Sequence, residues 1–292
     1  MNILLFGANG QVGAETRRRA GEDVRVIALS REDCDLTSPG AARAAIEAAD
    51  CDAVVNAAAY TAVDKAESET ELAMRINAGA PGEMAGACAK RGLPLIHFST
   101  DYVFNGEGSR PYREDDPTAP LGVYGATKLA GEEAVLNQGG AFAILRLSWV
   151  FSAYGSNFVK TMLRLGKERP GLRVVADQRG KPTPAAGAAE AGLVAARALL
   201  ADPGKTGVYH FAGDEETTWA GFAEAILAEA ELATPVEHIG TKDFPTPAKR
   251  PAYSVLDTDK FEKTFGMAPP SWRGALKEVL RELECGAERG GV

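Results

Sequence analysis

NILLFGANGQVG, residues 2–13, joins a strand-like apolar run to a glycine-rich turn and the start of a helix. Glycines at 7, 10 and 13 allow a tight turn in which the backbone can approach a pyrophosphate closely. The helix that follows would offer free N–H groups and the positive end of its dipole to the same anion. Alone, the GxxGxxG spacing of Gly7, Gly10 and Gly13 also suits a plain tight turn. Because it follows the first strand of a βαβ series, we interpret it as a dinucleotide site.

The rest of the chain repeats this strand-then-helix order. Short apolar runs occur at 3–6, 24–29, 53–57, 95–98, 142–147 and 208–211, and helix-like stretches at 12–20, 40–49, 70–91, 126–137, 156–169, 185–201, 219–231 and 271–284. Alternation of this kind predicts an α/β protein: a Rossmann-type, doubly wound parallel sheet with a smaller C-terminal substrate-binding lobe. We assign residues 1–150 to a dinucleotide-binding domain, with a returning segment at about 172–206. Residues 151–171 and 207–292 are assigned to the lobe.

Composition excludes several classes of function. A net charge of −8 argues against a protein that coats nucleic acid. No apolar stretch is long enough to cross a bilayer, and the chain starts in a strand-like run, so we expect no signal peptide and a cytoplasmic protein. The four cysteines and three histidines are scattered without metal-ligand spacing, so no metal site is predicted. His97 and His210 lie in strand-like runs and are expected in the core or behind the site.

The end of the second strand bears on the choice of cofactor. An acidic residue that would bind a ribose 2′-hydroxyl is usual there, but this chain has Ser30-Arg31. Arginine can pair with a 2′-phosphate, which favours NADP(H) over NAD(H). A solvated Arg31 without that role is an equal alternative, so NAD(H) stays open.

Tyr124 and Lys128 form a YxxxK pair at the start of a predicted helix. Residues four apart share one helical face, so both side chains can reach the same space. An ammonium beside a phenol is expected to lower the phenol's pKa and make it a usable proton donor. A third hydroxyl is expected from a strand end beside the pair, where Ser99-Thr100 follows the apolar run 95–98. The long segment 105–122, between that strand and this helix, is predicted to be a functional loop.

Several longer motifs carry a resemblance to a known family. They are NILLFGANGQVG (2–13), VNAAAYTAVDKAESE (55–69), STDYVF (99–104), VYGATKLAGE (123–132), LRLSWVF (145–151), NFVKTML (157–163), DQRGKPT (177–183) and KRPAYSVL (249–256). Over nearly its whole length the chain resembles the extended short-chain dehydrogenases/reductases, and among them the dTDP-4-dehydrorhamnose reductase family. The resemblance implies NAD(P)H-dependent reduction of dTDP-4-dehydro-β-L-rhamnose to dTDP-β-L-rhamnose, in dTDP-L-rhamnose biosynthesis.

The resemblance also implies roles for individual residues. Tyr124 would donate the proton, and Lys128 would adjust the pKa of the Tyr124 phenol. Thr100 would form a hydrogen bond with the reacting oxygen. Positions that match substrate contacts are Asp101, Tyr102, Trp149 and Arg250. Cofactor positions are Gly7, Gly10, Gln11, Val12, Gly13, Ser30, Arg31, Asp35, Leu36, Ala59, Tyr60, Thr61 and Phe98, together with Tyr124 and Lys128.

One departure from the family's pattern concerns a magnesium-bridged dimer. Glu15 matches a ligand position in some relatives, but Pro184-Ala185-Ala186 stands where a glutamate would be expected. A metal bridge is therefore in doubt, a homodimer is left open, and we expect Glu15 to be a solvated helix residue.

Two other functions remain open at this point. The chain could be another nucleotide-sugar reductase or epimerase, which a tightly retained cofactor would favour. It could also be a non-catalytic regulatory subunit of the same fold. The set of Tyr124, Lys128 and Thr100 speaks against the second, because a binding module has no need of it.

Overall fold

A computed structural model describes residues 1–289, and the side chains of residues 1–285. At its centre lies a sheet of six parallel strands in the spatial order β10-β5-β4-β3-β1-β2. The strands are β1 (Asn2–Phe6), β2 (Arg25–Leu29), β3 (Ala53–Asn56), β4 (Leu95–Thr100), β5 (Phe142–Leu147) and β10 (Gly207–His210). β3, β4 and β5 are buried along their whole length, which explains their almost unbroken apolar sequence.

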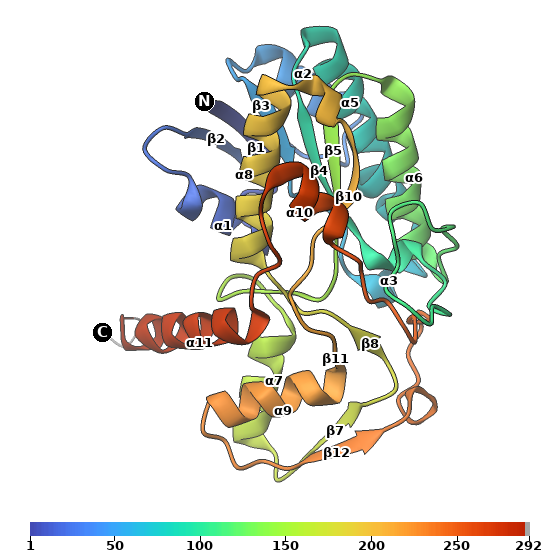
Figure 1. Ribbon diagram of the computed structural model, residues 1–292, viewed down its shortest axis with the longest axis vertical. Helices are drawn as coiled ribbons and strands as arrows, with labels where there is room; N and C mark the ends of the chain where they lie inside the picture. The colour runs from blue at the N-terminus through green and yellow to red at the C-terminus, as the bar shows by residue number, and fades with distance from the viewer. Residues whose placement is uncertain (290–292) are drawn as a thin grey trace.

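Helices cover both faces of this sheet, as Figure 1 shows. One face carries α1 (Gln11–Arg19), α8 (Ala185–Ala201) and α10 (Asp259–Phe265), and the other carries α2 (Ala41–Ala48), α5 (Ala80–Arg91) and α6 (Val123–Gln138). The strand order reverses direction between β1 and β3, since the chain moves from β1 outward to β2 and then crosses to β3. Ligands of open α/β sheets bind in the crevice that such a reversal opens at the carboxyl ends of the strands.

A smaller lobe lies below the sheet in Figure 1. Its helices are α7 (Phe158–Glu168), α9 (Trp219–Glu229) and α11 (Trp272–Arg289). Three short two-stranded ladders accompany them: β7 (Leu172–Val175) with β12 (Val236–Ile239), β8 (Arg179–Gly180) with β11 (Thr217–Thr218), and β6 (Val150–Phe151) with β9 (Thr183–Pro184). A separate apolar core built around Phe151, Phe222 and Trp272 holds the lobe together.

The predicted helix at 70–91 is confirmed as one helical segment, but it is not α-helical throughout. It consists of α4 (Thr70–Met74), a π-helical turn η1 (Arg75–Gly79) and α5. The remaining short elements are α3 (Val63–Ala66) and the 3₁₀ turns η2 (Asp101–Val103), η3 (Pro203–Lys205) and η4 (Thr241–Asp243). Single π-helical turns inside α-helices often lie at functional sites.

The doubly wound parallel sheet is confirmed, but two assigned boundaries need correction. β10 belongs to the central sheet and α10 packs on it, although 207–292 was assigned to the lobe. β7 lies in the lobe, although it was assigned to the returning segment. Pairing with a distant strand decides both cases, and local pattern does not carry that information.

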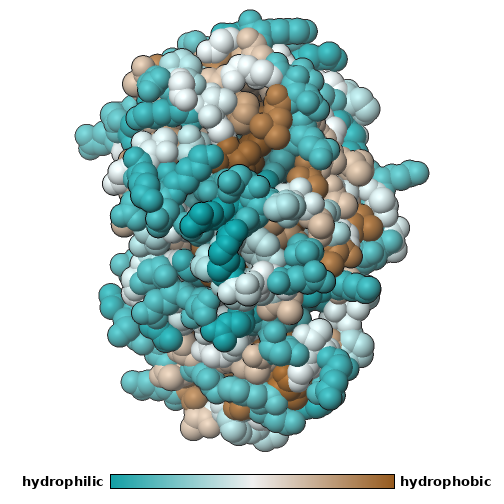
Figure 2. All heavy atoms as spheres, turned by 45° about the vertical axis from the view of Figure 1, so that its right-hand side comes forward, coloured by the Kyte–Doolittle hydropathy of each residue, from teal (hydrophilic) through white to brown (hydrophobic). Residues whose placement is uncertain are grey.

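Two general surface properties complete the description. The face shown in Figure 2 is mainly hydrophilic, and its apolar atoms form small separate patches. Among residues 1–289, no helix combines the length and the apolar character that crossing a membrane requires.

Candidate active site

The glycine turn lies where β1 meets α1, at the reversal of strand order. Gly7 has a φ of 78°, and a Cβ there would lie 2.5 Å from the backbone nitrogen of Ala58. A Cβ on Gly13 would lie 2.1 Å from the carbonyl oxygen of Gly7. Both contacts are with the main chain, so a side chain at either position would break the tight turn. The turn leads directly into the N-terminus of α1, whose free N–H groups suit a pyrophosphate.

The predicted adenosine positions follow β2. Ser30 is bound to Asp33 through its N–H and hydroxyl, and the carboxylate of Asp35 accepts two bonds from Thr37. The guanidinium of Arg31 is largely exposed and lies 4.0 Å from Asp35. Leu36 is buried in the core, so its side chain packs rather than presents a polar contact. The Arg31 side chain thus extends into solvent beside Asp35.

Residues 59–61 follow β3, and the buried side-chain amide of Asn77 fixes their main chain. The side chain of Asn77, in the π-helical turn, exchanges bonds with the backbone N–H and C=O of Tyr60 at 2.8 and 3.1 Å. The same amide donates to Thr127 on α6 at 3.0 Å. Asn77 therefore ties the loop that carries Ala59, Tyr60 and Thr61 to the helix that carries Tyr124 and Lys128.

Tyr124 stands at the start of α6, beside the end of β4. A hydrogen bond with Thr100 lowers the pKa of the phenol, but burial outweighs it and raises that pKa to about 12. This direction is opposite to the one expected from the YxxxK spacing, because desolvation of the phenol dominates. Tyr124 is consequently protonated at neutral pH, which is the form a proton donor needs.

Lys128 lies one turn further along α6 and is wholly buried. Its Nζ donates to the carbonyl oxygen of Phe98 at 2.6 Å and lies 3.5 Å from Nε2 of His97. Burial lowers the pKa of this ammonium to about 8. The ring of Phe98 packs against α8 near Gly192, so this residue contributes its carbonyl, not its ring, to the group around Lys128.

Asp101 places a second acidic group next to the phenol. Its Oδ1 accepts from the Thr100 hydroxyl at 3.1 Å, whereas its buried Oδ2 has no partner. Burial raises the pKa of this carboxyl to about 7. The ring of Tyr102 meets that of Tyr124 edge-on, with centroids 5.7 Å apart. Thr100, Asp101, Tyr102 and Tyr124 are thus brought together, as the sequence predicted.

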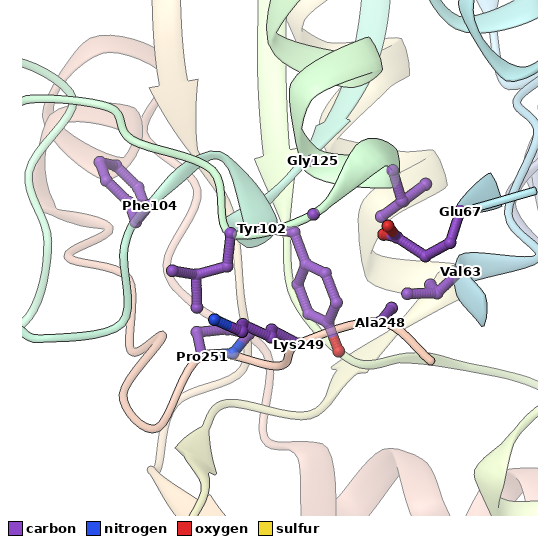
Figure 3. A pocket seen from close by; sticks show the side chains of 11 residues that line it. Val63, Glu67, Tyr102, Phe104, Gly125, Ala248, Lys249 and Pro251 are labelled. Carbon is purple, nitrogen blue, oxygen red and sulfur yellow. The ribbon is translucent and has the colours of Figure 1, made fainter. Parts of the chain in front are cut away.

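A small pocket opens beside these residues, with an empty volume of about 240 Å³. Figure 3 shows Val63, Glu67, Tyr102 and Gly125 from the sheet side facing Ala248, Lys249 and Pro251 from the C-terminal part. The end of the long loop, Leu121 and Gly122, also lines it. The predicted functional loop therefore borders the site.

Arg250 does not line this pocket but fastens its far wall. Its guanidinium lies 2.9 Å from a carboxylate oxygen of Asp64, and the other oxygen of Asp64 accepts from Ala248 N–H at 3.2 Å. The pair joins α3, which contains Asp64, to the segment 248–251. Arg250 therefore holds the segment that carries Ala248 and Lys249 against α3.

Trp149 lies at the entrance to the lobe. It has a φ of 47°, which is uncommon for a bulky residue, and its ring stacks on Trp219 with centroids 3.7 Å apart. Gly180 faces the same ring, because a Cβ there would lie 2.5 Å from it. Trp149 is thus packed between Trp219 and Gly180, and it is not among the residues that line the pocket described above.

The prediction that Glu15 is a solvated helix residue is wrong. It is buried, with 1% of its side chain exposed, and pairs with Arg18 and Arg19. It was expected to be solvated, but the packing of α1 on α8 covers it. Within the described residues, no group of three or more His, Cys, Asp or Glu side chains could hold a metal ion.

Comparison with known proteins agrees with this geometry. A family model described as "RmlD substrate binding domain" matches residues 1–285. A dTDP-4-dehydrorhamnose reductase from Burkholderia thailandensis is 45% identical over 97% of this chain and 99% of its own length. The Escherichia coli K12 protein of the same name is 44% identical over 97% and 98%. This chain belongs to the dTDP-4-dehydrorhamnose reductase family.

Solved structures of dTDP-4-dehydrorhamnose reductases superpose closely on this fold. The Clostridium acetobutylicum protein has a TM-score of 0.91 at 38% identity, covering 97% of this chain and 100% of its own. The Bacillus anthracis protein, solved in complex with NADP, has a TM-score of 0.90 at 34% identity, covering 96% and 99%. A Thermus thermophilus UDP-glucose 4-epimerase, with a TM-score of 0.82 at 20% identity, shares the fold.

Sequence reasoning missed several residues around this dTDP-4-dehydrorhamnose reductase-type site. Asn56, Asn77, Asp64 and Trp219 were not singled out, and His97 was placed only in the core or behind the site. Each acts through a partner at least 17 positions away in the chain. A polar residue in a buried run, such as Asn56 or His97, was the one signal that could have marked two of them.

Proposed function

We propose that this chain reduces the 4-keto group of dTDP-4-dehydro-β-L-rhamnose to give dTDP-β-L-rhamnose, with NADPH as the favoured reductant. The observation that carries the proposal is that Tyr124 meets the Thr100 hydroxyl at the end of β4, with Lys128 buried one turn further along α6. The family's name supplies the substrate. The division into a cofactor domain and a substrate lobe, a homodimer and a cytoplasmic location are further predictions.

The glycine turn suits a dinucleotide, because its tight backbone, which tolerates no side chain at Gly7 or Gly13, leads into the N-terminus of α1. Gly10, Gln11 and Val12 would hold its pyrophosphate, and Lys128 and residues 59–61 would lie along its nicotinamide half. Ser30, Asp35 and Leu36 would border the adenosine, and Arg31 would pair with a 2′-phosphate. When bound, a dihydronicotinamide supplies the hydride.

The protein's own part is to place the keto oxygen and manage its proton. Thr100 and Tyr124 would donate hydrogen bonds to that oxygen, on which negative charge grows as the carbon is reduced. The Tyr124 hydroxyl would then give up its proton to form the alcohol. Lys128 would stabilise the phenolate that remains. Asp101, Tyr102, Trp149 and Arg250 would bind the sugar and its phosphates.

The direct test is NADPH oxidation over a panel of nucleotide-linked 4-keto sugars, repeated with NADH. We expect the dTDP-linked 4-keto-6-deoxy sugar to be the best substrate. Tyr124→Phe should lower kcat by about 10²–10⁴-fold while cofactor binding is retained, since only the proton donor is lost. A Tyr124→Phe variant with near-normal kcat would exclude this phenol as the acid.

A further inference from the structure

His97 lies between two polar side chains that come from different elements. It belongs to β4 and is completely buried. Its Nδ1 lies 3.0 Å from Nδ2 of Asn56, at the end of β3, and its Nε2 lies 3.5 Å from Nζ of Lys128 on α6. The three side chains form a line that ends at the lysine of the candidate site.

The orientation of the Asn56 amide is fixed by the main chain. Its Oδ1 accepts from the N–H of Ala58 at 3.1 Å. A backbone N–H can only donate, so the amide atom that faces it must be the oxygen. The NH₂ group of Asn56 therefore faces His97, and Nδ1 of the ring must be the acceptor.

This arrangement determines the tautomer of His97. A neutral imidazole that accepts at Nδ1 carries its hydrogen on Nε2. Burial, together with the nearby Lys128, holds the pKa of His97 well below its ordinary value, so the ring is neutral at pH 7. The Nε2–H consequently points at Nζ of Lys128, which is itself a donor when charged. Two donors facing each other explain why this contact is long.

We propose that Asn56 and His97 are positioning residues that present an N–H to Lys128, weaken its ammonium form and leave the Phe98 carbonyl as the acceptor that fixes Nζ. The tautomer stands independently of the reaction, whereas its effect on catalysis rests on the proposed reductase function. A lysine held in this way can lose and regain a proton near neutral pH. Lys128 would therefore change its charge during the pH titration of activity, whereas an ordinary lysine would stay protonated.

Two acidic side chains also lie on the elements around Lys128. Glu132, one turn further along α6, favours the ammonium, but it is bound to Arg146 of β5 at 2.7 Å and to Ser99 of β4. From η2, Asp101 lies beside Thr100 and Tyr124. Burial lowers the pKa of Lys128 by more than Glu132 raises it, because that pKa falls to about 8. The donor on His97 acts in the same direction as burial.

The tautomer can be read directly by nitrogen-15 NMR of the full chain labelled at histidine. The protein has three histidines, and His97→Phe would identify the signals of His97 by their loss. We expect a protonated, pyrrole-type Nε2 and an unprotonated, pyridine-type Nδ1. Protonation at Nδ1 instead would overturn the proposal, whatever the enzyme's activity.

Asn56→Asp is the most informative variant. It keeps the shape of the side chain at position 56 but replaces the hydrogen-bond donor that faces Nδ1 of His97 with an acceptor. A carboxylate can only accept, so Nδ1 must carry the hydrogen and Nε2 becomes an acceptor for the ammonium. We expect the His97 tautomer to invert. The basic limb of the kcat profile, assigned to loss of the Lys128 proton, should move up by about one pH unit.

The double variant His97→Phe/Asn56→Asp controls for the added charge, since it retains the carboxylate and removes the ring. Its upward shift, measured against His97→Phe, should be smaller. If Asn56→Asp changes neither the tautomer nor the basic limb, the proposal is wrong. A wild-type protein without reductase activity would instead end the proposed function, and the NMR result would still decide the tautomer.

Discussion

Asp101 shows what the fold imposes on a single residue. Its carboxyl is buried beside Thr100 and Tyr124, and one of its oxygens has no hydrogen-bond partner. Burial therefore raises the pKa of the carboxyl from 3.8 to about 7 in the folded protein. Below about pH 7 the folded protein holds a proton there, which the unfolded chain releases above its ordinary pKa.

This difference makes Asp101 a source of pH-dependent stability. A carboxyl whose pKa is raised by folding contributes stability that is present below about pH 4 and is lost as pH rises to about 7. Asp101→Asn copies the protonated form and cannot ionise. Measured by thermal unfolding from pH 4 to 8, the Tm of the variant should rise relative to wild type over that interval. A Tm difference independent of pH would contradict the assigned shift.

Local spacing predicted part of the candidate site. Tyr124 and Lys128 lie four apart on one helix, and Thr100 ends a strand, so periodicity alone brings them close. The line from Asn56 through His97 to Lys128 could not be predicted, because it crosses three elements. The pKa of Tyr124 also required the fold, since its direction depends on how deeply the phenol is buried.

At the scale of elements, α6 is held in place by close packing on the π-helical turn η1. A Cβ at Gly131 would lie 2.0 Å from the carbonyl oxygen of Asn77. That same turn supplies the amide that holds Tyr60, so the helix and the loop after β3 share one support. The π-helical turn has no sequence signature that we recognised, and the segment was predicted as one helix.

Gly131→Ala tests this packing. Alanine favours a helix over glycine by about 1 kcal/mol, but the clash with a main-chain carbonyl should outweigh that gain and destabilise the protein by about 1–3 kcal/mol. Gly86→Ala is the matched control, because its Cβ would meet the flexible end of Gln138 at 3.1 Å. Urea unfolding should show a lower midpoint for Gly131→Ala and an unchanged or higher midpoint for Gly86→Ala, where the helix preference of alanine meets no main-chain clash. Equal midpoints would argue against the close contact.

Elements that show a clear pattern in their own sequence were predicted well, whereas elements that depend on pairing with distant residues were not. β4 and β5 are buried on both faces, so their apolar runs identified them. The ladders β8–β11 and β6–β9 contain only two residues per strand, too few to show a pattern. Their pairing depends on residues brought together by the lobe's fold.

At the scale of the whole molecule, the central sheet and the C-terminal part meet around the candidate site. Asp64 and Arg250 link them on one side of the pocket. On the other side, bridges join Glu107 to Tyr253 and Tyr112 to Leu256, which attach the long loop to the returning chain. The sheet side supplies Tyr102 and Tyr124, while the other part supplies Lys249 and Pro251. Neither part alone forms the pocket.

In the proposed reaction, the dihydronicotinamide transfers its hydride to C4 of the keto sugar, and Tyr124 protonates the oxygen on that carbon. Its most direct measurement uses NADPH deuterated at the transferred position of C4, with the dTDP-linked 4-keto-6-deoxy sugar as substrate. Mass spectrometry of the product should show one added deuterium, located at C4 of the sugar, and Tyr124→Phe should form this product about 10²–10⁴-fold more slowly. A product that contains no deuterium, or deuterium that stays on the cofactor, would contradict the account.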